Sequence, residues 1–156
     1  MACMSADRQL QESVDRLRAK IGTRIKDHGS GAVDRVSVRR FREALGLVPD
    51  PDLGVPVMMV AHLLRADADV TRDQRPSESV DDMLADPVNG GTEAEFARPL
   101  ILDEVIRGEM FLADAFLREG KAGAMAVVVT VSRYTDSQQR EVANLRSTMI
   151  YRGVKA

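Results

Sequence analysis

The two histidines are the side chains best suited to move protons near neutral pH, because an imidazole titrates close to that range. His62 lies in the almost wholly apolar run 57–66 and is the first candidate for a catalytic acid or base. The alternative, which these surroundings favour, is a helix histidine that packs in the core and bonds to a carbonyl group. His28 lies in the run Asp-His-Gly-Ser-Gly, which predicts an exposed loop.

Glu93 and Glu95 form the second candidate group, because they alternate with Ala94 and Phe96. On a strand both carboxylates face the same way and Phe96 points inward. The two carboxylates could form an acid/base pair beside a pocket, but the pattern favours a solvated outer face. No histidine has a cysteine or a second histidine at metal-ligand spacing, so we predict no metal site.

Two further features could bind a substrate. Gly54 and Pro56 precede the apolar run, so a helix starting near Val57 and Met58 would present unpaired amides that can polarise a carbonyl group. Basic side chains that could contact a phosphate group are Arg98, Arg118, Lys121 and Arg133. The alternative for each of these cations is an ordinary solvated surface position.

Composition narrows the classes of protein to consider. The chain has 156 residues and a formal net charge of -2, with acidic and basic residues interleaved. One domain is expected at this length, and nucleic-acid binding is not, because it needs a basic face. No apolar run approaches the ~18 residues of a membrane span, so we expect a cytoplasmic protein that does not bind membranes. The single cysteine, Cys3, excludes an internal disulfide.

The first half of the chain is predicted to be mainly helical. Leu10, Val14, Leu17 and Ile21 make one apolar stripe on a charged helix over residues 6–20. A short strand is expected at 33–36, followed by a helix over 38–45 that Ser37 caps and Gly46 ends. Residues 49–56 read as a loop, 57–66 as a buried helix, and 67–87 as a long loop with a helical turn near 80–84.

Beyond residue 87 the apolar residues recur with a period of 2 instead of 3.6, which predicts strands. The first leads from Gly90 and Gly91 to Arg98-Pro99, and three sequential antiparallel strands follow, over about 105–116, 125–132 and 144–151, with a turn at 136–140. In the second of these four strands, Met110, Leu112 and Phe116 are expected on one face. The chain is therefore predicted to be α+β, with one antiparallel sheet.

The run Val88–Pro99, the turn Gly120–Gly123 and the run Arg146–Tyr151 resemble the MaoC-like dehydratase family, specifically the N-terminal half of double hot-dog enoyl-CoA hydratases. The resemblance covers residues 21–152 and implies a hot-dog fold, with the antiparallel sheet wrapped around one central apolar helix. Residues 1–20 would be a helical extension of this single domain. Gly90 and Gly91 join the predicted substrate-binding residues.

The family's catalytic signature is missing. In catalytic members an Asp and a His lie in a Tyr-x-x-x-Asp-x-Asn-Pro-x-His-like stretch after a helix that ends in Gly. The matching stretch here is Phe41–Asp50, in which Leu47 stands in the place of the Asp and no His follows before His62. An aliphatic side chain cannot accept a proton, so this chain is not expected to catalyse the family's reaction with the usual residues.

The resemblance therefore implies an accessory, pocket-forming subunit of a heteromeric enoyl-CoA hydratase or 3-hydroxyacyl thioester dehydratase, in which a second hot-dog subunit supplies Asp and His. One alternative is a self-sufficient homo-oligomeric hydratase, or an acyl-CoA thioesterase that uses Glu93, Glu95 or Asp103 with helix amides. A non-catalytic acyl-thioester binding module is a third. No cofactor is expected, since coenzyme A or phosphopantetheine enters as part of the substrate. An open sheet edge predicts at least a dimer.

Overall fold

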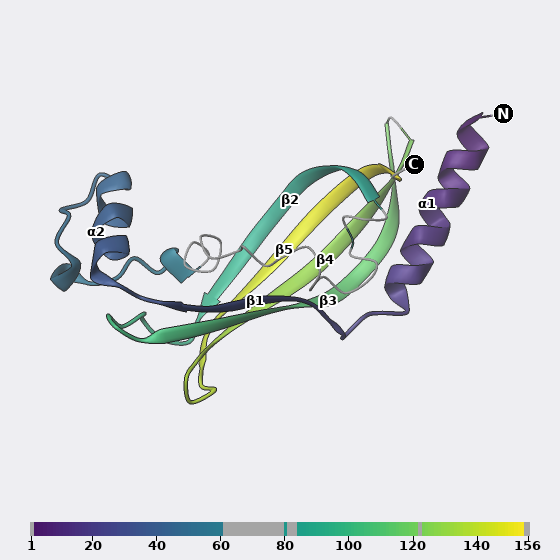
Figure 1. Ribbon diagram of the computed structural model, residues 1–156. Helices are drawn as coiled ribbons and strands as arrows, with labels where there is room; N and C mark the ends of the chain where they lie inside the picture. Colours follow the sequence, from purple (N-terminus) through teal and green to yellow (C-terminus); the bar gives the residue numbers. More distant parts are fainter. Residues whose placement is uncertain (1, 61–79, 81–83, 122, 155–156) are drawn as a thin grey trace.

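The computed structural model of the protein describes residues 2–60, 80, 84–121 and 123–154. Its elements are α1 (Ala2–Arg18), β1 (Arg24–Ala32), α2 (Arg35–Ala44), the 3-10 helix η1 (Pro51–Leu53), β2 (Leu84–Phe96), β3 (Val105–Gly120), β4 (Gly123–Asp136) and β5 (Glu141–Val154). The five strands form one antiparallel sheet in the order β1-β3-β4-β5-β2. Figure 1 shows α1 beside one end of this sheet and α2 beyond the other end. The predicted α+β class is confirmed.

Helix α1 covers one end of the inner face of the sheet. Leu10, Val14 and Leu17 are buried, as the apolar stripe predicted, and they form one core with side chains of β3, β4 and β5. Ile21 does not continue the stripe and is 44% exposed, because the helix has already ended. Gly22 then turns the chain with a φ of 83°, and its amide bonds to the carbonyl group of Leu112.

A second core lies at the α2 end of the sheet. Val33 and Val38 pack there with Ile106, Tyr134 and Val142. Met59 and Val60 begin the predicted apolar helix and are fully buried in this core. Residues 61–66 of that helix, His62 included, lie outside the described residues, as does most of the predicted loop 67–87. None of the described helices is long and apolar enough to cross a bilayer.

The first strand differs from the prediction. It spans Arg24–Ala32 and runs through the glycine-rich stretch 27–31, for which an exposed loop was predicted. Residues 33–36, predicted as a strand, instead lead into α2, which begins at Arg35. The strand tolerates these glycines because it lies at the sheet edge, where its pairing with β3 shifts register twice and Gly29 adopts a φ of 76°. The two register shifts also hide the alternation that would have revealed the strand.

Helix α2 begins earlier than predicted, and its cap is Asp34 rather than Ser37. The carboxylate of Asp34 accepts a hydrogen bond from the backbone amide of Ser37, which lies inside the first turn. Gly46 follows the end of the helix with a φ of 70°, as predicted. Strand β2 also starts earlier, at Leu84, and can include Pro87 because it is an edge strand.

Because β3 contains a bulge, the side chains that point to the core differ from those predicted. The register with β4 shifts between Leu112 and Asp114, so one extra residue is inserted. Alternation is therefore reversed beyond the bulge, and Ala115, not Phe116, takes the next inner position after Leu112. Val128 on β4 lies directly opposite Ala115 in the same core.

We predict that Leu17→Ala lowers the free energy of unfolding by about 2–5 kcal/mol, because it removes a side chain that is 1% exposed from the α1 core. Urea denaturation measures the change. The matched control is Gln9→Ala, an exposed position of the same helix, which should stay within ~0.5 kcal/mol of the parent. Equal effects of the two substitutions would contradict the packing of α1 on the sheet.

Candidate functional site

The stretch that matches the family's catalytic signature forms the end of α2 and the loop after it. Arg42 holds this loop, since its Nε donates to the carbonyl of Val48 at 2.7 Å and one of its terminal nitrogens donates to that of Gly54 at 2.8 Å. Leu47 is 45% exposed on the loop. The nearby carboxylate of Asp50 accepts the amide of Asp52 and caps η1. The resemblance therefore predicts an exposed alkyl group at the position of the family's base.

The predicted helix amides lie just beyond this loop. Val57 and Met58 are 41% and 50% exposed, and the amides of Met59 and Val60 bond back to Pro56 and Val57. Val57 and Met58 therefore occupy the opening turn, where backbone amides point along the helix axis without intrahelical partners. Their role in binding a thioester carbonyl stays a prediction.

Glu93 and Glu95 lie on one face of β2, as predicted, while Phe96 packs against the core on the other face. The two carboxylates line an open groove of about 410 Å³ on the outer side of the sheet, opposite α1. The other residues that line this outer groove are Val131, Arg133, Glu141, Asn144 and Arg146. Both glutamates are exposed, in agreement with the solvated alternative, and their catalytic role stays a prediction.

His28 is not in an exposed loop. It lies on β1 and is partly buried, where its Nε2 is 3.4 Å from the Oγ of Ser132 and its ring stacks on Tyr134 with centroids 6.2 Å apart. Ser132 and Thr130 are buried polar residues on the inner side of β4. Sequence reasoning missed this polar cluster, although two hydroxyl residues at alternate positions of an apolar strand were a visible signal.

The candidate phosphate-binding cations do not converge. Arg118 pairs across the sheet with Met125, and Lys121 lies in the adjacent turn at the tip of the β3–β4 hairpin. Arg133 is eight residues along β4 from Met125, which is ~26 Å at ~3.3 Å per residue. Its guanidinium carbon lies 4.9 Å from the ring centroid of Phe111 on the outer face. These side chains cannot bind one phosphate group together.

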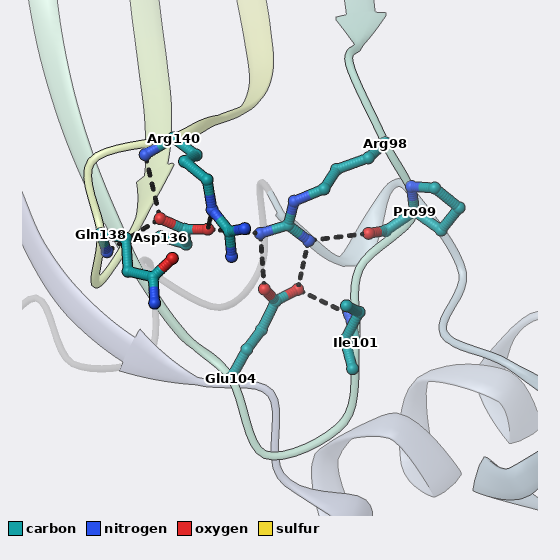
Figure 2. A network of polar contacts seen from close by, with 7 residues as sticks. All are labelled: Arg98, Pro99, Ile101, Glu104, Asp136, Gln138 and Arg140. Atoms are coloured by element: carbon teal, nitrogen blue, oxygen red, sulfur yellow. Dashed lines mark hydrogen bonds and ion pairs between the residues drawn. The ribbon is translucent and has the colours of Figure 1, made fainter.

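Arg98 is held inside the chain by an ion-pair network at the α2 end of the sheet (Figure 2). Its terminal nitrogens donate to both carboxylate oxygens of Glu104, at 3.2 and 2.7 Å, and to Asp136 at 3.1 Å. Asp136 also accepts the amides of Gln138 and Arg140 and the Nε of Arg140. The network ties the end of β2 to the start of β3 and to the β4–β5 turn. The phosphate-binding role of Arg98 stays a prediction.

Asp136 is the strongly perturbed acid of this network. Burial by itself would raise the pKa of its carboxyl group, but hydrogen bonds from the backbone and side chain of Arg140 and from the amide of Gln138 lower the pKa to about 2. The side chain is 5% exposed. Asp136 is thus a fixed anion at neutral pH, suited to holding structure rather than to exchanging protons.

The two predicted binding glycines lie at a register shift of β2. The shift falls between Asn89 and Gly91, and Gly91 has a φ of 145°, which side chains rarely adopt. A Cβ on Gly90 would lie 3.2 Å from the carbonyl oxygen of Thr148 and 3.3 Å from carbon atoms of Ile150. The bulge itself therefore explains both glycines, and their contact with substrate stays a prediction.

Asp103, the remaining carboxylate considered for thioester hydrolysis, lies exposed in the turn before β3, with a φ of 64° and its amide bonded to the carbonyl of Val33. The described part of the chain contains no group of three or more His, Cys, Asp or Glu side chains that could hold a metal ion. The absence of a metal site stays a prediction for the whole chain.

Comparison with solved structures identifies the architecture. A chain of the ChsH1-ChsH2 complex from Mycobacterium tuberculosis matches with a TM-score of 0.70 and 15% identity over 94% of this chain and 93% of its own. The MaoC-like dehydratase from Rhodospirillum rubrum matches with a TM-score of 0.59 and 15% identity, over 87% of this chain and 94% of its own. A chain of the C-terminally truncated HadBC (3R-hydroxyacyl-ACP dehydratase) complex from M. tuberculosis matches with a TM-score of 0.53 and 16% identity. The match covers 77% of this chain and 89% of the HadBC chain. No family model and no curated protein matches the sequence.

These matches confirm the predicted hot-dog fold and the structural likeness to MaoC-like dehydratases over most of the chain. Two of the three structures are complexes. At 15–16% identity the likeness is one of fold, so it does not transfer catalytic residues to this chain. The residues of this chain have to be judged on their own chemistry.

We predict that Asp136→Asn lowers stability at pH 7 and flattens its pH dependence in acid. A carboxyl group whose pKa is lowered on folding, here from 3.8 to about 2, contributes stability above pH 4 that is lost as the pH falls through 2. Urea unfolding at pH 7, 4, 3 and 2 measures both effects. The control is Asp7→Asn, which changes an exposed carboxylate on α1. If the stability of Asp136→Asn fell between pH 4 and pH 2 as much as that of the parent, the stabilising role of the Asp136 carboxylate would be contradicted.

Proposed function

We propose that this chain is the accessory subunit of a heteromeric MaoC-like enoyl-CoA hydratase or 3-hydroxyacyl thioester dehydratase. It shapes the acyl pocket, and a second hot-dog subunit supplies the catalytic Asp and His. The substrate is an acyl thioester, whose coenzyme A or phosphopantetheine moiety comes with it. The observation that carries the proposal is Leu47, an exposed alkyl side chain at the position of the family's base.

The structural neighbours support a two-chain enzyme. ChsH1-ChsH2 and HadBC are both complexes, and the HadBC complex is a 3R-hydroxyacyl-ACP dehydratase. This chain covers 93% of the ChsH1-ChsH2 chain that it matches, so it has the length of one subunit of such a complex. A second chain with the missing acid and base is the arrangement that reconciles the fold with Leu47.

Within the assembled site this chain would bind and orient the substrate. The partner's general base activates water for attack at C3 of the enoyl thioester, and its acid delivers a proton at C2. The amides near Val57 and Met58, at the opening turn of the apolar helix, would stabilise the developing enolate oxygen. Their exposure leaves them accessible to a thioester.

The two sheet edges differ in a way that indicates where the second subunit pairs. Strand β1 has two register shifts, a feature that protects an edge from pairing. Strand β2 is longer, from Leu84 to Phe96, has one register shift and is exposed along most of its length. The β2 edge is therefore the edge proposed to pair with another hot-dog sheet.

We expect the isolated chain to lack appreciable hydration of trans-2-enoyl-CoA, at least ~10² to 10⁴ below the complex with a hot-dog subunit that carries the Asp-x-Asn-Pro-x-His stretch. Absorbance of the enoyl thioester measures the rate for each chain alone and for the two co-expressed. Robust turnover by the purified chain alone would overturn the accessory role. Hydrolysis of acyl-CoA by the chain alone would instead support the self-sufficient thioesterase.

We also expect Ala94→Lys to prevent pairing at the β2 edge. Ala94 is exposed near the C-terminal end of β2, so the monomer can accept the longer side chain, whereas lysine on an edge strand opposes a second strand. Sedimentation velocity with the partner subunit, or with the chain alone, compares the variant with the parent. The control is Ala19→Lys, exposed after α1. Unchanged association of Ala94→Lys would exclude this edge.

A further inference from the structure

The inner face of the sheet carries a row of hydroxyl groups. Thr92 on β2 lies opposite Ser147 on β5, and Ser147 lies opposite Thr130 on β4. Ser132 follows Thr130 on the same face of β4, because alternate residues of a strand point to one side. His28 on β1 reaches this group, since its Nε2 is 3.4 Å from the Oγ of Ser132. We call these five residues the polar band.

The polar band separates the two apolar cores of the sheet. On β5, Ser147 lies between Met149, which packs against the α1 core, and Leu145, which belongs to the second core. Thr130 and Ser132 take the same place on β4. Packing against apolar segments alone would favour apolar residues here as well, since a buried hydroxyl group without a partner costs free energy. The band therefore favours a contact that forms hydrogen bonds with it.

The chain itself satisfies these hydroxyl groups poorly. The Oγ1 of Thr92 and the Oγ of Ser147 are 3.4 Å apart, as are the Oγ of Ser132 and the Nε2 of His28, whereas good bonds of these types measure ~2.7–3.0 Å. Within the described part of the chain, the side chain of Thr130 has no hydrogen-bond partner. A hydroxyl group can donate one hydrogen bond and accept two, so the band keeps donors and acceptors for a ligand.

The band can be reached from the β2 edge of the sheet. Thr92 is exposed at this edge, Ser147 is half-buried, and Thr130 is 8% exposed. The described residues have only two fully enclosed side-chain atoms without a partner, on Arg98 and Asn144, so the hydroxyl group of Thr130 keeps some contact with solvent. Strands lie ~4.8 Å apart, so the row leads about 10 Å inward from the edge.

We propose that the polar band binds a neutral oxygen substituent, a ketone or a hydroxyl group, on the distal part of the substrate's acyl group. This inference rests on the proposed function and names the class of acyl thioester that the enzyme takes. A ketone oxygen accepts hydrogen bonds from Thr130 and Ser132, and a hydroxyl group can also donate one to them. The apolar remainder of the acyl group lies against the apolar residues on either side of the band.

The position of the second core assigns the oxygen to the distal part of the acyl group. Met59, which directly follows the amides proposed to hold the thioester, packs in this core with Tyr134 and Leu145. Ser132 lies beyond Tyr134 along β4, and Ser147 lies beyond Leu145 along β5. The core therefore lies between the thioester and the band, so the oxygen that the band binds is remote from the reacting carbons.

The chemistry of the band selects against other acyl groups. A wholly apolar acyl group would cover the hydroxyl groups and leave them without partners, which costs free energy. A carboxylate or an ammonium group at the end of the chain would find no side chain of fixed opposite charge among the five residues of the band. A neutral oxygen is the substituent that satisfies the hydroxyl groups without burying a charge.

The test uses the complex with the partner subunit and a set of trans-2-enoyl-CoA thioesters of one chain length. One member is unsubstituted, and the others carry one ketone or hydroxyl group at successive carbons of the tail. The best oxygenated substrate should exceed the unsubstituted one at least ~10-fold in kcat/KM, because a site built for hydrogen bonds rejects a ligand that leaves it unpaired. Thr130→Val and Ser132→Ala should each reduce this preference by roughly 5- to 10-fold.

The matched control is Thr135→Val, which removes a hydroxyl group from the outer side of the same strand and should keep the parent's preference. Urea unfolding supplies a second readout. The unfolding midpoint of Thr130→Val should equal or exceed that of the parent, since the lost hydroxyl group has no partner in the described chain. A midpoint clearly below that of the parent would assign Thr130 a structural role and overturn the inference.

Isothermal titration calorimetry with the saturated acyl-CoA series, on the full chain alone and on the complex, needs no turnover and separates the two proposals. A complex that hydrates every member of the series with equal kcat/KM, or band variants that keep the parent's preference, would overturn this inference and leave the proposed function standing. Preferential binding of the oxygenated thioesters without any hydration would support the band as a binding site and overturn the enzymatic role.

Discussion

An antiparallel sheet with one apolar face is stable in water only where another element covers that face. In this protein the inner face is covered in two parts. Helix α1 packs over one end with Leu10, Val14 and Leu17, and a second core gathers around Ile106 and Tyr134 at the other end. Between them the inner side of β4 becomes polar, at Thr130 and Ser132. The arrangement of every other surface follows from this choice of inner face.

At the α2 end of the sheet an ion-pair network lies beside the second apolar core. The side chains of Arg98, Glu104 and Asp136 are 23%, 14% and 5% exposed. Charges in such positions are tolerated only when each one is paired and hydrogen-bonded, because desolvation is otherwise expensive. The network meets this condition by joining the β2–β3 connection to the β4–β5 turn (Figure 2). An arginine used in this way is a poor candidate for binding a mobile phosphate group.

Two surfaces remain for partners once the inner face is covered. The β2 edge offers unpaired backbone groups, and the outer face offers side chains of both signs. Under the proposed function, pairing at the β2 edge would bring a second active-site chain beside this one. Under the proposed function, Leu47 at the position of the family's base makes pairing at the β2 edge necessary, because a second chain would supply the base.

The sequence by itself determined the periodic features. The stripe of α1, the four later strands and the glycine that ends α2 could be read from spacing, because burial on one side imposes a period of 3.6 or 2. The resemblance also predicted from the sequence that the family's acid and base are replaced, since the alkyl side chain of Leu47 has no proton to exchange. Even the shared face of Glu93 and Glu95 followed from alternation alone.

Only the tertiary structure decided what depends on residues distant in the chain. Strand β1 was missed because an edge strand with two register shifts shows no alternation, and Phe116 was misplaced because a bulge is defined by the neighbouring strand. His28 meets Ser132, 104 positions away, and Arg98 meets Asp136, 38 positions away. Such contacts are set by strand register and by sheet order, and local sequence patterns carry no information about either.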